Sequence, residues 1–117
     1  MTKRAYSLYR ERGYAAVLLV AALRGTYHLT ELAGADLVMS IAPAFQEPFV
    51  SREFPREERI DRQVPADVVA RLGAMPEFVR AYEPDGMAPN EFLGYGVTQR
   101  TLSQFIEAGW RLIENFE

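Results

Sequence analysis

The stretch YAAVLLVAALRGTYHLTELAGADLVMSIAP, Tyr14–Pro43, decides the fold class. It contains two short apolar runs, Ala16–Leu23 and Leu37–Ala42, and Ser40 is the one polar residue in the second run. Between these runs, Gly25–Gly34 has helical spacing and ends on a glycine. A strand that is apolar on both faces, then a helix, then another such strand is typical of a parallel β-α-β crossover. We therefore predict an α/β fold built on one parallel β-α-β unit.

Helix start and stop signals predict the remaining elements. Thr2, Thr26 and Thr98 are placed to cap helices, and Gly13 and Gly34 are placed to end the first two. The predicted strands cover about Ala16–Ala22 and Leu37–Ile41. Besides the crossover helix, the predicted helices cover about Lys3–Arg12, Ala44–Gln46 (a short helix or turn), Pro65–Leu72, Glu77–Glu83, Met87–Leu93 and Thr98–Phe116.

The last of these helices carries the strongest periodic signal. Its apolar residues recur every three or four positions, which predicts one buried stripe. Gly109 lies inside that stripe, where it permits close helix packing at a cost of about 1 kcal/mol relative to alanine. We call this set the C-terminal stripe: Leu102, Phe105, Ile106, Gly109, Trp110, Ile113 and Phe116.

The chain of 117 residues is expected to form a single domain. We divide it into an α-β-α-β unit over residues 1–45, a charged connection over 46–64 and a helical part over 65–117. The connection contains prolines and a dense mixture of both charge signs, a pattern typical of a solvated segment.

Composition excludes several classes of function. The net charge of −3 argues against nucleic acid as the main partner. The sequence has no cysteine, which excludes disulfides and thiolate chemistry and fits a reducing compartment. The charged N-terminal residues predict no signal peptide, and no apolar run is long enough to span a bilayer. We expect a cytoplasmic protein with no membrane partner and no cofactor.

Arg24 is the candidate binding residue. It follows the carboxyl end of the first predicted strand and precedes a helix N-terminus, the edge where α/β folds bind anionic ligands. A guanidinium group there suits a phosphate. The residue types alone leave open the alternative of a surface arginine that only solvates a loop.

Other chemistry-bearing residues carry weaker signals. His28, the only histidine, has no second ligand at metal-binding spacing, so we expect a structural or solvated side chain and no metal site. Ser40 has no histidine placed to activate it. Lys3, the only lysine, lies on a helix face that is expected to be exposed, which argues against Schiff-base chemistry. Trp110 and the other aromatic residues are expected to be core.

Three segments together resemble the end of a transaldolase: AYSLYRERGYAAVLLVAALR, ELAGADLVMSIAP and DGMAPNEFLGYGVTQRTLSQFIEAGW. They occur in the family's order and cover about Ala5–Phe45 and Asp85–Ile113. Transaldolases are (β/α)₈ barrels that move a three-carbon unit between sugar phosphates through a lysine Schiff base. The resemblance implies the last quarter of such a barrel with additional C-terminal helices. Ala35 stands where the family often has cysteine.

The resemblance also bears on the site. The family's phosphate site includes a Ser-Phe-Arg step after the seventh strand, and this sequence has Ala22-Leu23-Arg24 there. Arg24 therefore matches a phosphate ligand, whereas Ala22 replaces the serine and removes one hydroxyl donor. The catalytic lysine and carboxylates of the family belong to earlier strands and have no counterpart here, so no catalytic residue is predicted.

Two parallel strands with open edges do not make a stable sheet alone. Either the C-terminal helices cover the exposed face, or several copies assemble into a homo-oligomer. Three functions remain open. The chain is a transaldolase-like fragment or truncated relative that is not catalytic alone and keeps a residual sugar-phosphate site, a subunit or fragment that completes a transaldolase active site with another chain, or a non-enzymatic oligomerisation and binding module.

Overall fold

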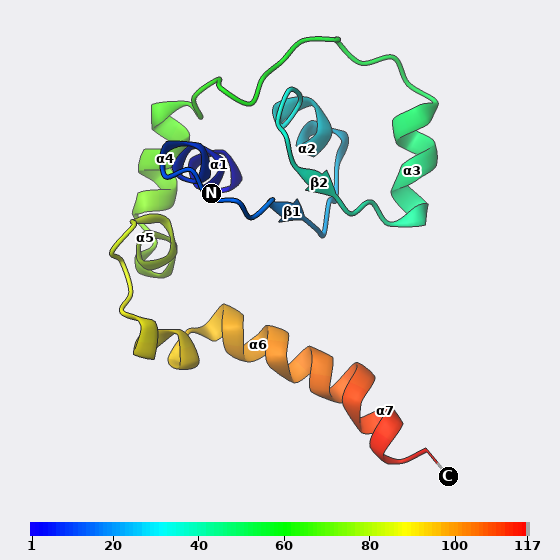
Figure 1. The fold of residues 1–117 in the computed structure, drawn as a ribbon, viewed down its shortest axis with the longest axis vertical. Coiled ribbons are helices and arrows are strands. Elements are labelled where there is room, and N and C mark those ends of the chain that lie inside the picture. Colours follow the sequence, from blue (N-terminus) through cyan, green and yellow to red (C-terminus); the bar gives the residue numbers. More distant parts are fainter. Residues whose placement is uncertain (117) are drawn as a thin grey trace. The chain divides into compact units, whose positions relative to one another are not determined.

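The computed structural model describes residues 1–116 (Figure 1). The chain divides into two compact units, unit 1 over Met1–Pro65 and unit 2 over Ala66–Glu117. Unit 1 contains the sheet and the first three helices, and unit 2 is helical. The prediction of a single domain with a charged connection stays a prediction.

The centre of unit 1 is a two-stranded parallel sheet. Strands β1 (Leu19–Val20) and β2 (Val38–Met39) are joined by helix α2 (Thr26–Glu31). Leu19 pairs with Val38, and ladder hydrogen bonds run from the Val38 N–H to the Leu18 carbonyl (2.9 Å) and from the Ser40 N–H to the Val20 carbonyl (2.8 Å). The α/β class and the parallel β-α-β unit are thus confirmed. The strands are much shorter than the apolar runs that predicted them.

The sheet is not covered on both faces. Exposure alternates along β1 and β2, and Leu19 and Val38 are both exposed. The strands are therefore apolar on both faces, as the sequence indicated, but the described chain leaves one of these faces exposed. A continuous apolar run is typical of a strand with a covering layer on each face, whereas unit 1 covers only one face of β1 and β2.

Helices α1 (Thr2–Glu11) and α3 (Pro43–Val50) complete unit 1. Gly13 and Gly34 adopt positive φ angles of 62° and 87°, as expected of residues that end helices. The predicted threonine caps are wrong. The helices begin one to three residues earlier, after Met1, Gly25 and Tyr95, and none of these three residues makes a side-chain cap hydrogen bond.

The core of unit 1 consists of Leu23, Leu32 and Ile60. Ile60 comes from residues 57–62, which we call the return segment because it folds back onto the end of α2. The Ala33 carbonyl accepts hydrogen bonds from the N–H groups of Arg59 (2.9 Å) and Ile60 (3.1 Å). The expectation of a wholly solvated segment is therefore wrong here, because charge density did not reveal the one apolar side chain that anchors it.

Unit 2 is a series of short helices that ends in a longer helical segment. Arg80 organises its first half, because its guanidinium pairs with Glu77 (3.0 Å) and Glu91 (3.5 Å) and lies over the Tyr95 ring. The elements are α4 (Ala66–Gly73), α5 (Pro76–Tyr82), the 3₁₀ helix η1 (Pro89–Gly94), α6 (Gly96–Phe105), the π-helical turn η2 (Ile106–Trp110) and α7 (Arg111–Glu114).

The single long helix predicted over about Thr98–Phe116 is instead two α-helices, α6 and α7, joined by the π-helical turn η2, and the C-terminal stripe along them is not buried. Its side chains are exposed, and no residue of unit 2 that the structure describes is buried. The prediction of a buried stripe, with Trp110 in a core, is therefore wrong for this chain by itself. Amphipathic spacing shows that a helix has a face to cover, but it does not show that the same unit covers it.

In the part of the chain that the structure describes, none of the helices combines the length and the apolar character that a transmembrane span requires.

Candidate functional site

The candidate site lies where the chain leaves β1. The carboxyl ends of parallel strands meet at the same edge of a sheet, so the residues after Val20 and those after Met39 share one edge. Residues 21–25 form the connection from β1 to α2 at that edge, and Arg24 lies in this connection, as predicted.

The backbone of this connection is unusual at Ala22. Its φ angle of 56° lies in the left-handed region, and it is the one non-glycine residue with positive φ in the described chain. Alanine in this conformation costs roughly 1–2 kcal/mol. The next residue, Leu23, is 2% exposed and belongs to the core. Burial of Leu23 therefore holds the strained turn in place and directs the chain outward at Arg24.

His28 supports the same turn from α2. Its Nδ1 atom accepts a hydrogen bond from the backbone N–H of Arg24 at 3.1 Å, so Nδ1 carries a lone pair and not a proton. The His28 ring also lies against the Tyr27 ring, with centroids 4.0 Å apart. A structural role for His28 was one of the two expectations from the sequence, and this contact gives it that role.

The Arg24 side chain is exposed, and its guanidinium has no ion-pair partner among residues 1–116. Other arginines of the chain do have ion-pair partners: the guanidinium groups of Arg59, Arg62 and Arg80 each contact a carboxylate. An unpaired guanidinium at the carboxyl edge of a parallel sheet is suited to a phosphate or another anion.

The other candidates contribute little at this edge. Ala22 has no side-chain donor, and exposed Ser40 uses its backbone N–H in the sheet. Within the described residues, no group of three or more histidine, aspartate or glutamate side chains could hold a metal ion.

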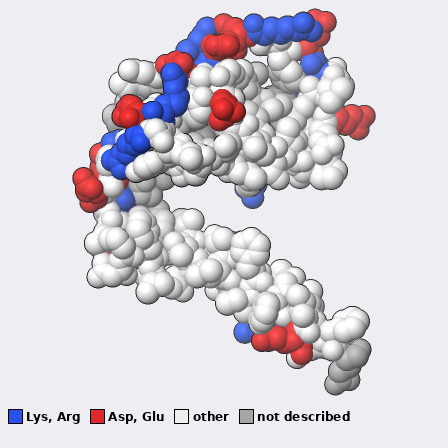
Figure 2. Space-filling model, in the orientation of Figure 1, with Lys and Arg blue, Asp and Glu red and all other residues white. Residues whose placement is uncertain are grey.

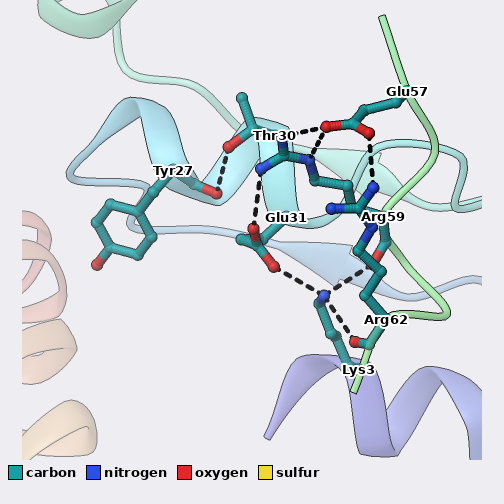
Figure 3. Close-up of polar contacts among 7 residues, drawn as sticks. All are labelled: Lys3, Tyr27, Thr30, Glu31, Glu57, Arg59 and Arg62. Carbon is teal, nitrogen blue, oxygen red and sulfur yellow. Dashed lines mark hydrogen bonds and ion pairs between the residues drawn. The ribbon is translucent and has the colours of Figure 1, made fainter. Parts of the chain in front are cut away.

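A second polar cluster lies at the junction of α1, α2 and the return segment (Figure 3). The Lys3 ammonium donates to Glu31 Oε2 (2.9 Å) and to the carbonyls of Arg59 (2.8 Å) and Arg62 (3.0 Å). Glu31 also contacts the Arg59 guanidinium (3.4 Å), and Glu57 joins Arg59 to Arg62. We call these five residues the Lys3 network: Lys3, Glu31, Glu57, Arg59 and Arg62.

Hydrogen bonds to the charged forms set the protonation of this network. The hydrogen bond from Lys3, with a smaller contribution from Arg59, holds the pKa of Glu31 below its ordinary value. The hydrogen bond from Arg59 does the same for the pKa of Glu57, and Glu57 in turn raises the pKa of Arg59. Both carboxylates of the network are therefore stabilised in their charged form by the cations that they contact.

The Lys3 network was not predicted. The sequence led us to expect an exposed Lys3, but its side chain is only 14% exposed and the chain uses all three ammonium hydrogens. The partners lie 28 to 59 residues away in sequence, so no local spacing indicates them. The expected exposure of Lys3 is therefore wrong, and it is three hydrogen bonds, not solvent, that occupy its amine.

Comparison with known proteins gives one informative relative. Over 101 residues, the chain is 32% identical to a transaldolase of Glaesserella parasuis serovar 5 (strain SH0165). The alignment covers 85% of this chain but 31% of the relative, so the chain spans about a third of the length of the curated relative that it matches. No protein-family model and no solved structure matches. The chain is thus transaldolase-like in sequence over most of its length.

Proposed function

We propose that this chain is a transaldolase relative that binds the phosphate group of a sugar phosphate at Arg24 and is not catalytic by itself. In this proposal, its β-α-β unit corresponds to part of a (β/α)₈ barrel. The similarity to a transaldolase supports the ligand class, since sugar phosphates are the substrates of that family.

The single observation that carries the proposal is the unpaired Arg24 guanidinium at the carboxyl edge of the sheet. The position fits the ligand-binding edge of α/β folds, and the side chain is free to form two parallel hydrogen bonds to phosphate oxygens. Ala22 supplies no hydroxyl beside it, so affinity depends on the guanidinium more than it would in a site with serine.

The contacts of Lys3 support the proposal that the chain is not catalytic by itself. A Schiff base needs a neutral amine with a free lone pair. The only lysine of the chain is an ammonium group that donates to a carboxylate and two carbonyls. A nucleophilic amine would first have to leave these three hydrogen bonds, which hold the Lys3 side chain away from any bound carbonyl compound.

Two measurements test these halves. Borohydride treatment with fructose 6-phosphate should leave the mass of the protein unchanged, and a stable covalent adduct would contradict the absence of catalysis. Fructose 6-phosphate should raise the melting temperature of the native chain but not that of Arg24→Gln. Arg52→Gln is the matched control, because Arg52 is also exposed and belongs to unit 1 but lies away from the sheet edge. Equal responses of the two variants would remove Arg24 from the site.

One observation favours a second candidate, in which another chain completes a transaldolase active site with this one. Over residues 1–116 the sheet has two strands, and each has an outer edge that no described strand pairs with. A partner with further barrel strands would pair with these edges and cover exposed Leu19 and Val38. Purification from the native host under mild conditions tests this candidate. The partner must carry transaldolase-like sequence, and its absence would count against the candidate.

The same open edges also suit a binding or assembly module in which the old site serves protein contacts. The Arg24→Gln variant separates this third candidate from the first. If the substitution changes assembly but no response to sugar phosphate, the assembly module is the better account.

A further inference from the structure

Arg24 by itself leaves part of a phosphate group without a partner. A phosphate monoester has three terminal oxygens, and the guanidinium fork of Arg24 can bond to two of them. Ala22, earlier in the same connection, has no side-chain donor for the third oxygen. A second donor has to come from another residue, and His28 is the polar side chain that the structure brings into contact with Arg24.

This contact fixes which nitrogen of His28 carries a proton. The backbone N–H of Arg24 can only donate, so the Nδ1 atom of His28, 3.1 Å away, must accept. A neutral imidazole that accepts at one nitrogen carries its N–H at the other, so Nε2 is a donor. Because both nitrogens belong to one small ring, this Nε2–H lies close to Arg24 as well.

The Nε2–H of His28 is free to bind a ligand. It has no hydrogen-bond partner over residues 1–116. Among the described residues that are not exposed, every buried side-chain nitrogen or oxygen atom does have a partner. His28 is half-buried, so its unpartnered Nε2 atom must reach the surface.

Tyr27 and Gly25 hold the His28 ring in a defined orientation. The rings of Tyr27 and His28 have centroids 4.0 Å apart, with an angle of 40° between their planes. The Tyr27 ring in turn lies against the backbone of Gly25, since a Cβ on Gly25 would be 2.8 Å from Tyr27 Cε1. This close approach requires glycine. The local sequence Arg24-Gly25-Thr26-Tyr27-His28 therefore positions both the guanidinium and the imidazole donor.

The acidic groups nearest in sequence are directed elsewhere. Glu31, the one acidic residue of α2, is bonded to Lys3 and Arg59 in the Lys3 network. Asp36 precedes β2 and therefore belongs to the opposite edge of the sheet from Arg24. In Figure 2 the visible surface over β1 and β2 is white, whereas acidic and basic groups gather along the connection from α3 to α4. An anion at Arg24 and His28 would thus meet donors without a competing carboxylate from α2.

We propose that the Nε2–H of His28 is the second donor to the phosphate group and binds the oxygen that the Arg24 fork leaves open. This inference rests on the proposed sugar-phosphate site at Arg24. It gives His28 a binding role in addition to the structural role of its Nδ1 atom. The imidazole donor takes the place of the hydroxyl that Ala22 lacks.

Nitrogen-15 NMR of the native chain tests the donor directly, because His28 is the only histidine. At about pH 8, where an ordinary histidine is neutral, Nδ1 should have the chemical shift of an unprotonated nitrogen and Nε2 that of a protonated one. Fructose 6-phosphate should shift the Nε2 resonance, whereas fructose should not. A proton on Nδ1, or an Nε2 resonance that fructose 6-phosphate leaves unchanged, would overturn the proposal.

Two substitutions separate the binding role of Nε2 from the structural role of Nδ1. His28→Asn keeps an acceptor near the position of Nδ1 but has no group at the position of Nε2. His28→Gln keeps a donor near the position of Nε2 but loses the acceptor for the Arg24 N–H. In calorimetric titration with fructose 6-phosphate, His28→Asn should raise the dissociation constant about tenfold or more, as expected for a lost hydrogen bond to a charged group. His28→Gln should raise it less than about threefold.

The opposite order of the two variants, or equal losses, would show that His28 acts only through the Arg24 turn and would overturn its binding role. Unchanged affinity in His28→Asn would overturn it too. Arg24→Gln separates this inference from the proposed function. If Arg24→Gln abolishes binding and His28→Asn does not weaken it, the second donor alone is wrong, whereas full binding by Arg24→Gln would remove the site itself. Urea unfolding shows whether each variant keeps its fold, and the NMR experiment needs no variant.

Discussion

Replacement of Lys3 by methionine tests the structural role of the Lys3 network. Methionine keeps the apolar part of the side chain and removes the ammonium group. The variant leaves the Arg59 and Arg62 carbonyls and Glu31 without the donor that they share. The return segment then loses its part-buried attachment to α1, although the exposed Arg10–Asp61 ion pair still joins the two and Ile60 still anchors the segment to the core.

The size of the effect follows from how exposed each bond is. Loss of the donor to the part-buried Arg59 carbonyl should cost about 1–3 kcal/mol, and loss of the exposed bond to Arg62 about 0.5–1 kcal/mol. The ion pair with half-exposed Glu31 adds less than about 1 kcal/mol because water screens it. We expect a total loss of about 2–4 kcal/mol in the free energy of unfolding.

Urea unfolding followed by circular dichroism measures this loss, with Arg10→Met as the control. Arg10 is also a cation on α1 and also pairs with the return segment, at 2.8 Å from Asp61, but both partners are exposed. Its replacement should cost no more than about 0.5 kcal/mol. If Lys3→Met costs no more than Arg10→Met, the network does not hold the return segment and the reasoning fails.

Three further predictions follow from the backbone and from the pKa shifts. Ala22→Gly should be neutral or stabilise the fold by up to about 1 kcal/mol, since glycine tolerates the positive φ. The control Ala21→Gly should destabilise the fold by about 0.5–1 kcal/mol. Equal losses of stability in thermal unfolding of the two variants would refute the strain at Ala22. Gly34→Ala should destabilise the fold by more than about 1 kcal/mol, because its φ is 87° and the new Cβ would lie 2.7 Å from Glu58 Cγ. Gly73 has open space at its Cβ position, so Gly73→Ala should not destabilise the fold. Similar melting temperatures for the two variants would count against this account. The pKa of Glu31 is lower in the folded state than its ordinary 4.5, so its contribution to stability is present above about pH 4.5 and is lost as the pH falls through the lower value. Glu31→Gln should therefore reduce the loss of unfolding free energy between pH 5 and pH 3, measured by urea unfolding. The same pH dependence of stability in the variant and the native chain would argue against the pairing.

The sequence predicts the order and type of elements better than their burial. Two apolar runs around a helical segment correctly indicate a parallel β-α-β unit, because few other arrangements join such runs. The same runs overstate strand length and cover, because an apolar pattern records which faces need a neighbour and not whether the chain supplies one. Leu19 and the C-terminal stripe are examples: both are apolar in pattern, and both are exposed because the described chain supplies no neighbour for them.

The polar residues of unit 1 also differ in how well the sequence predicts their positions. Arg24 could be placed from sequence because a strand end and a following helix are local features. The Lys3 network could not, because Lys3, Glu31 and Arg59 come from three segments that only the folded chain brings together. The strained Ala22 was likewise beyond prediction, since alanine gives no sequence sign of a positive φ.

Calorimetric titration of the native chain with fructose 6-phosphate and, separately, with fructose tests the central claim most directly. The two ligands differ only by the phosphate group, which is the part that Arg24 is proposed to bind. We predict measurable binding of fructose 6-phosphate that Arg24→Gln abolishes, and no measurable binding of fructose. Equal binding of the two sugars, or unchanged binding of fructose 6-phosphate to Arg24→Gln, would contradict the proposed site.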